Sequence, residues 1–410
     1  MTATAGPAAP ATTYHVVTVV WGSALIELLL DVCVPNQLSP GNLPALPPGS
    51  RYRIFTGPAD YAALVSSPRL EAVRRIMPVD VVQVDLAELD PKANPNVYKM
   101  MTACNRRAVA DAAAVDAALI FLSPDFILGE GVLAGFVRLH TGGKRAVLTA
   151  NLRLSREGFL AAWQQHAGRG ALPSRELVRL AMQHLHPATE SCVIDSANTN
   201  DFPTAVYWPV RSAAGLDGLL VRAFHLHPML LDPVYRTELP QTTLDGHYLL
   251  HACPDVDDSI VVDDSDELIV FELTPAARIV SNHDRRRGVS LLRLAAVEAK
   301  CDRLQRSHWQ HSIRIHAGDL DRRWAVAEAE AAAFAARLER YRAVGPFLSR
   351  LFRAMKTWRR RRDGYLRAAR RTVRGEARAL ARSVRRPLRH CDAYTRALRK
   401  AMQPQQATKR

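Results

Sequence analysis

Between residues 14 and 154, short apolar runs alternate with longer helical patterns, and this alternation limits the possible folds more than any other feature of the sequence. The apolar runs are rich in β-branched residues and have the uninterrupted character of strands buried on both faces. They lie at residues 14–22, 52–57, 79–86, 117–126 and 144–154, and helical patterns lie between them at 23–34, 58–76, 96–116 and 131–141. Strands and helices that alternate in this way predict an α/β fold with a mostly parallel sheet flanked by helices.

The rest of the chain has two further patterns. After a helical stretch at residues 155–186, residues 192–272 contain short strands joined by Asn, Asp, Gly and Pro turns, which we expect to extend the same sheet. After about residue 289 the pattern is helical to the end, with an apolar stripe on an Arg-rich helix. We therefore expect a disordered N-terminus at 1–13, an α/β domain at 14–288 with halves at 14–154 and 155–288, and a basic helical extension at 289–410.

The net charge of +15 comes from the C-terminal part of the chain. Residues 301–410 hold 29 Lys and Arg residues against 9 Asp and Glu, which leaves 26 basic and 31 acidic residues in the first 300. The basic balance therefore gives no reason to class the main domain as nucleic-acid binding. An Arg-rich amphipathic helix suits an anionic membrane surface, nucleic acid or a partner helix, and a solvated extension is the further alternative. Of these we favour the membrane surface.

The cysteines and the N-terminus both indicate a cytoplasmic protein. The six cysteines are scattered, without a C-x-x-C pair or zinc-ligand spacing, which is typical of reduced thiols. Residues 1–13 lack the basic and apolar regions of a secretory signal. The apolar run at 16–34 is as long as a membrane span, but Glu27 and Asp31 lie within it, so a buried strand followed by a helix is the better interpretation.

Polar residues follow two of the expected strands at the edge where parallel sheets bind ligands. Ligands of such sheets lie beyond the carboxyl ends of the strands, so Trp21, Gly22 and residues 123–125 should face one crevice. Asp125 follows an apolar strand directly, where a carboxylate destabilises the fold unless a cation or a hydrogen bond meets it. A divalent metal that carries a diphosphate would meet it, and an Asp that caps the next turn is the alternative.

The order of these motifs resembles that of GT-A-type glycosyltransferases, and of a bacterial, largely uncharacterised group among them. The resemblance is carried by the first strand ending in Trp-Gly, the segment PNQLSPGNLPAL at 35–46, the strand YRIFTG and the segment IFLSPDFILGEG at 120–131. It spans about residues 14–275 and implies a GT-A-like, Rossmann-like sheet whose first half binds a nucleotide sugar and whose second half binds the acceptor. It also implies an Asp-x-Asp motif that holds a divalent metal, Mn or Mg, and the sugar diphosphate. The segment Ser123-Pro124-Asp125 keeps only one of the two carboxylates.

Five residues are candidates for the donor site. Trp21 can stack on a base, Gly22 permits close approach of the backbone, and Asn42 can hydrogen-bond the nucleoside. Tyr98 and Lys99, at the start of the helix before the Asp125 strand, can reach a diphosphate. Core packing of Trp21 and a solvated Lys99 are the alternatives.

The metal and acceptor candidates lie further along the chain. His225 and His227 lie in the run at 218–231, which we expect to be one strand, and at this spacing their side chains share one face of it. The resemblance implies a late His as a further metal ligand beside Asp125. Histidines bonded to the backbone are the alternative. Asp264 and Asp266 offer a rival Asp-x-Asp, although a charge run between strands is usually a solvated loop. Asp245, beside a Gly turn, is the candidate carboxylate on the acceptor side.

These features predict transfer of a sugar from a nucleotide-sugar donor to an unknown acceptor, such as an envelope or lipid-linked one, by a cytoplasmic protein at the surface of the inner membrane. Asp125 and Asp245 are the predicted catalytic carboxylates. The alternative is a catalytically inactive glycosyltransferase-like module that binds a carbohydrate or a partner, with the basic tail as its anchor. Ser123, in place of an acidic residue, favours that module.

Overall fold

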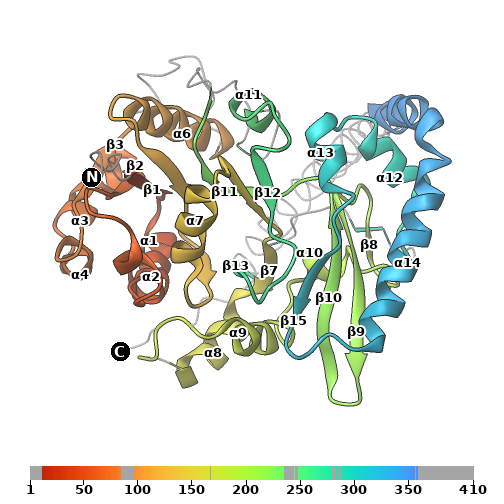
Figure 1. The fold of residues 1–410 in the computed structure, drawn as a ribbon, viewed down its shortest axis with the longest axis horizontal. Helices are drawn as coiled ribbons and strands as arrows, with labels where there is room; N and C mark the ends of the chain where they lie inside the picture. Colours follow the sequence, from red (N-terminus) through yellow and green to blue (C-terminus); the bar gives the residue numbers. More distant parts are fainter. Residues whose placement is uncertain are drawn as a thin grey trace, which may run out of the picture. The chain divides into compact units, whose positions relative to one another are not determined.

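The structure is a computed structural model, shown in Figure 1. It describes residues 12–84, 97–166, 168–234, 244, 248–278, 283–284, 288–355 and 357–358. The chain divides into two compact units, residues 1–346 and residues 347–410.

A seven-stranded sheet forms the centre of the first unit (Figure 1). Its strand order is β12-β6-β11-β4-β1-β2-β3. Every neighbouring pair is parallel except those of β11, which runs antiparallel to both β4 and β6. The strands are β1 (Tyr14–Val19), β2 (Arg51–Thr56), β3 (Val79–Gln83), β4 (Ala118–Phe121), β6 (Ala146–Thr149), β11 (His227–Leu231) and β12 (Ser259–Val261). The fold is thus a mixed α/β structure with a mostly parallel sheet, compatible with a Rossmann-like arrangement.

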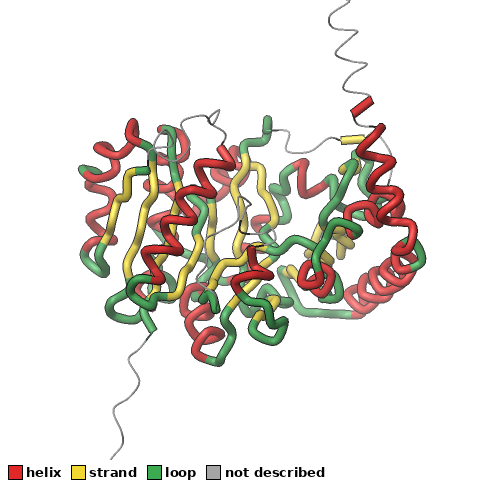
Figure 2. Tube along the Cα trace, turned by 90° about the horizontal axis from the view of Figure 1, so that it is seen from above, coloured by secondary structure: helices red, strands yellow, loops and turns green. Residues whose placement is uncertain are grey.

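Helices flank this sheet because its central strands are apolar on both faces (Figure 2). All four residues of β4 and all four of β6 are buried. The helices of this part are α1 (Ser23–Leu28), which continues as a π-turn (Leu29–Cys33) into α2 (Val34–Gln37), then α3 (Pro58–Val65), α4 (Glu71–Arg74), α6 (Val97–Ala113), α7 (Val132–Thr141) and α11 (Leu249–Ala252).

A second sheet of three strands lies next to the carboxyl end of β4. It has the order β5-β13-β7, with β5 (Phe126–Leu128), β13 (Val270–Thr274) and β7 (Leu152–Ser155). Only four residues separate β5 from the preceding strand β4, and only two separate β7 from the preceding strand β6. The helices after β7 are α8 (Arg156–Trp163), α9 (Ser174–Ala181) and α10 (Pro187–Glu190).

A third sheet, with the order β15-β10-β9, is formed by the C-terminal part of the first unit. Its strands are β9 (Ala205–Ser212), β10 (Gly215–Ala223) and β15 (Ile313–His316), all antiparallel. Helix α14 (Arg322–Glu339) packs along β9 and β10 and against α12 (Leu291–Glu298), and α13 (Arg303–His308) precedes β15 in the chain. A short pair, β8 (Thr199–Asn200) and β14 (His283–Asp284), completes the strands of the described residues.

The C-terminal boundary differs from the expectation of a helical extension from residue 289. The segment at 313–316 forms β15, which pairs with β10, and the first compact unit runs to residue 346. The physical reason is that apolar and polar residues alternate in this segment, as they do in a strand. Ile313 and Ile315 point into the apolar core, while Arg314 and His316 face the other side. Residues 289–346 therefore belong to the α/β unit.

The second unit is rich in basic residues. Residues 347–410 hold 21 Lys and Arg against 3 Asp and Glu. Residues 347–355 and 357–358 are helical, and most of the predicted apolar stripe lies outside the described residues. None of the helices in the described ranges combines the length and the apolar character needed to cross a membrane.

Candidate metal centre

The carboxyl edge of the main sheet collects polar residues from several strands. Trp21 follows β1, Asp125 follows β4, and Asp264 follows β12. His227 joins them because it is the first residue of β11, which runs antiparallel, and it stands opposite Thr149 at the end of β6. With strands about 4.8 Å apart, β12 lies about 14 Å from β4 and about 19 Å from β1 along this edge.

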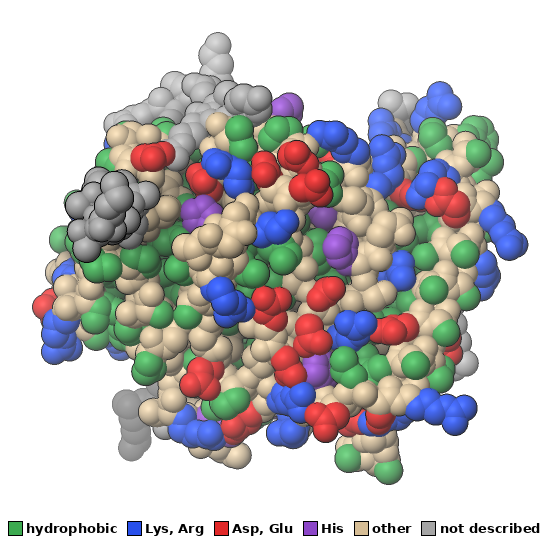
Figure 3. Space-filling model, viewed as in Figure 1, with side chains coloured by type: hydrophobic (Ala, Val, Ile, Leu, Met, Phe, Trp, Pro, Cys, Tyr) green, Lys and Arg blue, Asp and Glu red, His purple; other side chains and the backbone are tan. Residues whose placement is uncertain are grey.

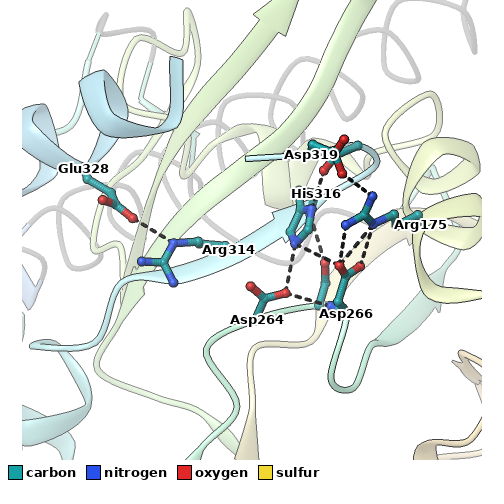
Figure 4. Close-up of polar contacts among 9 residues, drawn as sticks. Arg175, Asp264, Asp266, Arg314, His316, Asp319 and Glu328 are labelled. Atoms are coloured by element: carbon teal, nitrogen blue, oxygen red, sulfur yellow. Dashed lines mark hydrogen bonds and ion pairs between the residues drawn. The ribbon is translucent and has the colours of Figure 1, made fainter. Parts of the chain in front are cut away.

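Asp264, Asp266 and His316 converge at the β12 end of this edge (Figure 4). One ligand atom from each of the three side chains lies within 4.8 Å of the others. His316 Nε2 is 2.9 Å from Asp264 Oδ1 and 3.9 Å from Asp266 Oδ2. The imidazole is 2% exposed, whereas the two carboxylates are partly open to solvent, so the cluster has a buried floor and an accessible mouth.

Backbone contacts hold the cluster in place. The loop after β12 pairs with β15: Ser265 N donates to the Arg314 carbonyl, and His316 N donates to Ser265 Oγ. Asp264 Oδ1 also accepts a hydrogen bond of 2.9 Å from Asp266 N, which closes a tight turn between the two carboxylates. Asp264 and His316, which are 52 residues apart in sequence, are therefore brought together by strand pairing, and the turn places Asp266 beside them.

The surroundings of the His316 ring restrict its protonation. Nδ1 lies 2.6 Å from the Gly318 carbonyl oxygen, which can only accept, so Nδ1 carries a proton. Nε2 faces the Asp264 carboxylate at 2.9 Å, so it either carries a second proton or binds a cation in place of that proton. An imidazole that donates its other N–H to a carbonyl has the orientation found in metal-bound histidines.

The charges around the cluster favour a divalent cation. Arg175 on α9 binds Asp266 at 2.7 Å and Asp319 at 2.6 Å (Figure 4). The hydrogen bonds from Arg175, and then the nearby His316, hold the pKa of Asp266 below its usual range. Three carboxylates and one guanidinium leave a charge of minus two beside a neutral His316, which a divalent ion would balance.

The residues fit such an ion. Two carboxylates and one imidazole are ligands that divalent metals accept, at about 2.0–2.2 Å from the ion. Ligand atoms bound to one ion lie at most about 4.4 Å apart, and His316 Nε2 lies 2.9 Å and 3.9 Å from the carboxylate oxygens of Asp264 and Asp266. Asp264, Asp266 and His316 could therefore hold a metal. An ion-paired network with a protonated His316 is the arrangement without one.

Asp125, the predicted metal ligand, lies in a different environment. Its carbonyl accepts a hydrogen bond from Leu273 N, and its side chain is half-buried close to Glu272, which forms an ion pair with Arg153. Burial, and then the charge of Glu272, raise the pKa of Asp125 far above the usual range of an aspartate. Among the described residues, the group with metal-ligand geometry does not include Asp125.

The raised pKa of Asp125 makes the stability of the protein depend on pH. The folded state holds this proton more tightly than the unfolded chain, so stability is highest below the ordinary aspartate pKa and falls as pH rises through the raised one, by up to about 1.4 kcal/mol per pH unit. Asp125→Asn removes this titration. The stability of the variant relative to the wild type should therefore be greater at about pH 9 than at about pH 5. Urea unfolding at both pH values measures this difference. Glu130→Gln, which changes an exposed carboxyl nearby, should leave the pH dependence as it is.

The two predicted histidines do not share a strand face. The sequence suggested one strand through residues 218–231, but β10 ends at Ala223 and β11 begins at His227, and the two strands belong to different sheets. His225 is exposed in the connection. The His227 ring packs edge-on against Phe126, with ring centroids 5.3 Å apart. The single strand on which the same-face argument rests is therefore absent from the described residues 218–231, and a metal-binding role of either histidine stays a prediction.

The donor-site candidates have varied surroundings. Trp21 is half-buried at the end of β1, and Gly22 has a φ of 82°, with its N–H donating to Asp60 Oδ2 at 2.8 Å. Asn42 is fully buried, and its amide bonds the backbone of Gly129 and Leu133, so it holds a loop together. Tyr98 and Lys99 lie in α6, but their side chains, like the whole of Asp245, lie outside the described residues.

Comparison with known proteins gives distant structural matches. No protein-family model matches the sequence, and no curated protein matches it. Among solved structures, 24 chains match. One is mouse xyloside xylosyltransferase 1 in its apo form, with 12% sequence identity and a TM-score of 0.22. The match covers 38% of this chain and 59% of that chain, which is less than two thirds of the xylosyltransferase chain.

Proposed function

We propose that this protein transfers a sugar from a nucleotide-sugar donor, with a divalent metal held by Asp264, Asp266 and His316. The observation that carries the proposal is the convergence of an Asp-x-Asp segment with a late histidine at the carboxyl edge of a mostly parallel sheet. The resemblance carried by the order of the sequence motifs implies both an Asp-x-Asp motif and a late histidine as metal ligands. The site is proposed after β12 in place of β4, where Ser123 interrupts the motif.

The metal would supply Lewis-acid stabilisation of the charge that develops on the leaving diphosphate. In this proposal Asp264 and Asp266 position the ion, and the Gly318 carbonyl orients the His316 ring. Arg175 stays paired with Asp266 and Asp319 and balances their charge at the mouth of the site. A donor bound there would extend along the edge toward Asp125 and Trp21, which follow β4 and β1, the third and fourth strands from β12.

The role of Asp125 in this proposal is to bind the donor. A carboxyl group that keeps its proton near neutral pH can donate a hydrogen bond to an oxygen of the bound donor, and burial, with the charge of Glu272, gives Asp125 that property. Asp245 stays the proposed acceptor-side base. The acceptor is proposed to be lipid-linked or part of the envelope, with the basic residues 347–410 lying on an anionic membrane surface.

A donor screen of the wild-type protein tests this function. We expect Mn²⁺ to raise the Tm, a nucleotide sugar to raise it further, and free nucleoside diphosphate to appear only when metal is present. The readouts are thermal unfolding and phosphatase-coupled detection of the released diphosphate, with EDTA as the control. If no donor shifts the Tm of the Mn²⁺-loaded protein, the proposal is overturned. Binding of a donor without turnover would support the inactive carbohydrate-binding module.

A further inference from the structure

A cavity of about 310 Å³ lies between α14 and the far end of β10, and it is separate from the proposed metal centre. Its lining includes Arg222 from β10, Trp309 after α13 and Ala335 from α14. Arg222 and His316 lie on the same face of the third sheet. His316 pairs with Gly218 of β10, and Arg222 lies four residues further along β10. This spacing corresponds to about 13 Å. The cavity is within the range of small-molecule sites, about 300–1,000 Å³.

The Arg222 side chain is buried without a carboxylate partner. The residue is 8% exposed, and among the described residues no carboxylate lies within ion-pair distance of its guanidinium. Its two terminal nitrogens donate to the Trp309 carbonyl at 3.3 Å and to Ser312 Oγ at 3.1 Å, both neutral acceptors. Its Nε has no hydrogen-bond partner in the described part of the chain. A buried cation normally has an anionic partner, because taking the charge out of water is unfavourable.

A second donor near Arg222 is also unused. Trp309 is 2% exposed and stacks on Phe224, and its indole Nε1 has no partner among the described residues. The other guanidinium of the cavity, Arg342, is already paired with Glu298 and Glu339. Glu339 lines the cavity as well, so its charged groups are two guanidiniums and one carboxylate, and of these only Arg222 has no ion pair within the described part of the chain. Arg222 Nε and Trp309 Nε1 have almost no exposed surface, which leaves the terminal nitrogens of Arg222 as the donors that an oxyanion in the cavity can reach.

We propose that this cavity binds a ligand through an oxyanion, a phosphate or a carboxylate, that contacts the terminal nitrogens of the Arg222 guanidinium. The flat guanidinium fork suits two oxygens of one oxyanion. The alanines of α14, Ala332, Ala335 and Ala336, leave the space for it. This binding site is independent of the proposed sugar transfer, since none of its lining residues belongs to the metal cluster.

Inorganic phosphate, and acetate as the carboxylate probe, test the site, with EDTA present so that the metal centre does not contribute. At matched ionic strength against chloride, we expect at least one probe to raise the Tm of the wild type by about 2–5 °C. Arg222→Met should lose this response and, without the probe, be as stable as the wild type or more so, because an unpaired buried charge is gone. Arg314→Met, on the same sheet face but paired with Glu328, should keep the response.

Ala335→Leu gives a second variant, which fills the cavity and leaves every charge in place. It should lose the response as Arg222→Met does, and Arg222→Lys should show a reduced one, because lysine lacks the fork. The proposal is overturned if neither probe shifts the wild type, or if the Arg222 and Ala335 variants respond as strongly as the wild type. The latter result would place the phosphate on other arginines, such as the exposed Arg350 and Arg353.

Discussion

Replacing Asp264 with asparagine should abolish the rise in Tm that Mn²⁺ gives the wild-type protein. Asparagine keeps the shape of the side chain and can still accept from Asp266 N, so the turn survives, but it removes the negative charge that faces His316 Nε2 at 2.9 Å. The affinity for Mn²⁺ should fall by at least the 10–100-fold that loss of a ligand's outer partner costs. Titration of Mn²⁺ followed by thermal unfolding measures the change.

Asp263→Asn is the matched control for Asp264→Asn. Asp263 is the neighbouring exposed aspartate and is not part of the cluster, so its variant should bind Mn²⁺ as the wild type does. Equal losses in the two variants would mean that Mn²⁺ is held by the general negative charge of the loop. An unchanged response in Asp264→Asn would reject the proposed ligand set, and a wild type that ignores Mn²⁺ would leave the ion-paired network as the role of these residues.

Gly218→Ala should destabilise the first unit by about 2–3 kcal/mol and weaken binding of Mn²⁺ at the same time. A Cβ at Gly218 would lie 2.2 Å from the Ile315 carbonyl oxygen, 2.9 Å from the Trp324 ring and 3.0 Å from the His316 Cα. Two of these atoms are backbone, so β15 has to move away from β10, and His316 moves with it. Chemical denaturation and Mn²⁺ titration measure the two effects.

Gly57→Ala separates local crowding from a general effect of replacing glycine. Gly57 precedes α3, has a φ of −82°, and a Cβ there meets no atom within 4 Å. Its variant should stay within about 1 kcal/mol of the wild type and keep its response to Mn²⁺. A Gly218→Ala protein that is destabilised but binds Mn²⁺ normally would show that the position of β15 does not control the site.

Much of the main sheet could be predicted from the sequence because most of its strands are recognisable from their local residue pattern. The runs that became β1, β2, β4 and β6 are short, apolar and bounded by turns, so local pattern alone locates them. The antiparallel β11 was not separated from β10, because Phe224 and Leu226 continue the apolar pattern through the connection. Where a strand inserts in a sheet depends on contacts far along the chain, which periodicity does not encode.

The candidate metal centre was only partly visible in the sequence. Asp264 and Asp266 were recognised as a rival Asp-x-Asp, yet a charge run between strands is usually solvated, and the third ligand was missed. His316 is 52 residues from Asp264, and Arg175 is 91 residues from Asp266. The alternating segment Ser312–His316 was the available signal for a strand that ends in a histidine. Its pairing with β10 could not be read locally.

The pairing of β15 with β10 decides how far the chain can be shortened. A protein that stops near residue 288 would leave one edge of β10 without its neighbour and would lack the imidazole that Asp264 contacts. It would also uncover the face of that sheet which α14 now packs against. Truncated forms made for crystallisation or assay should therefore retain residues through 346, where the first compact unit ends.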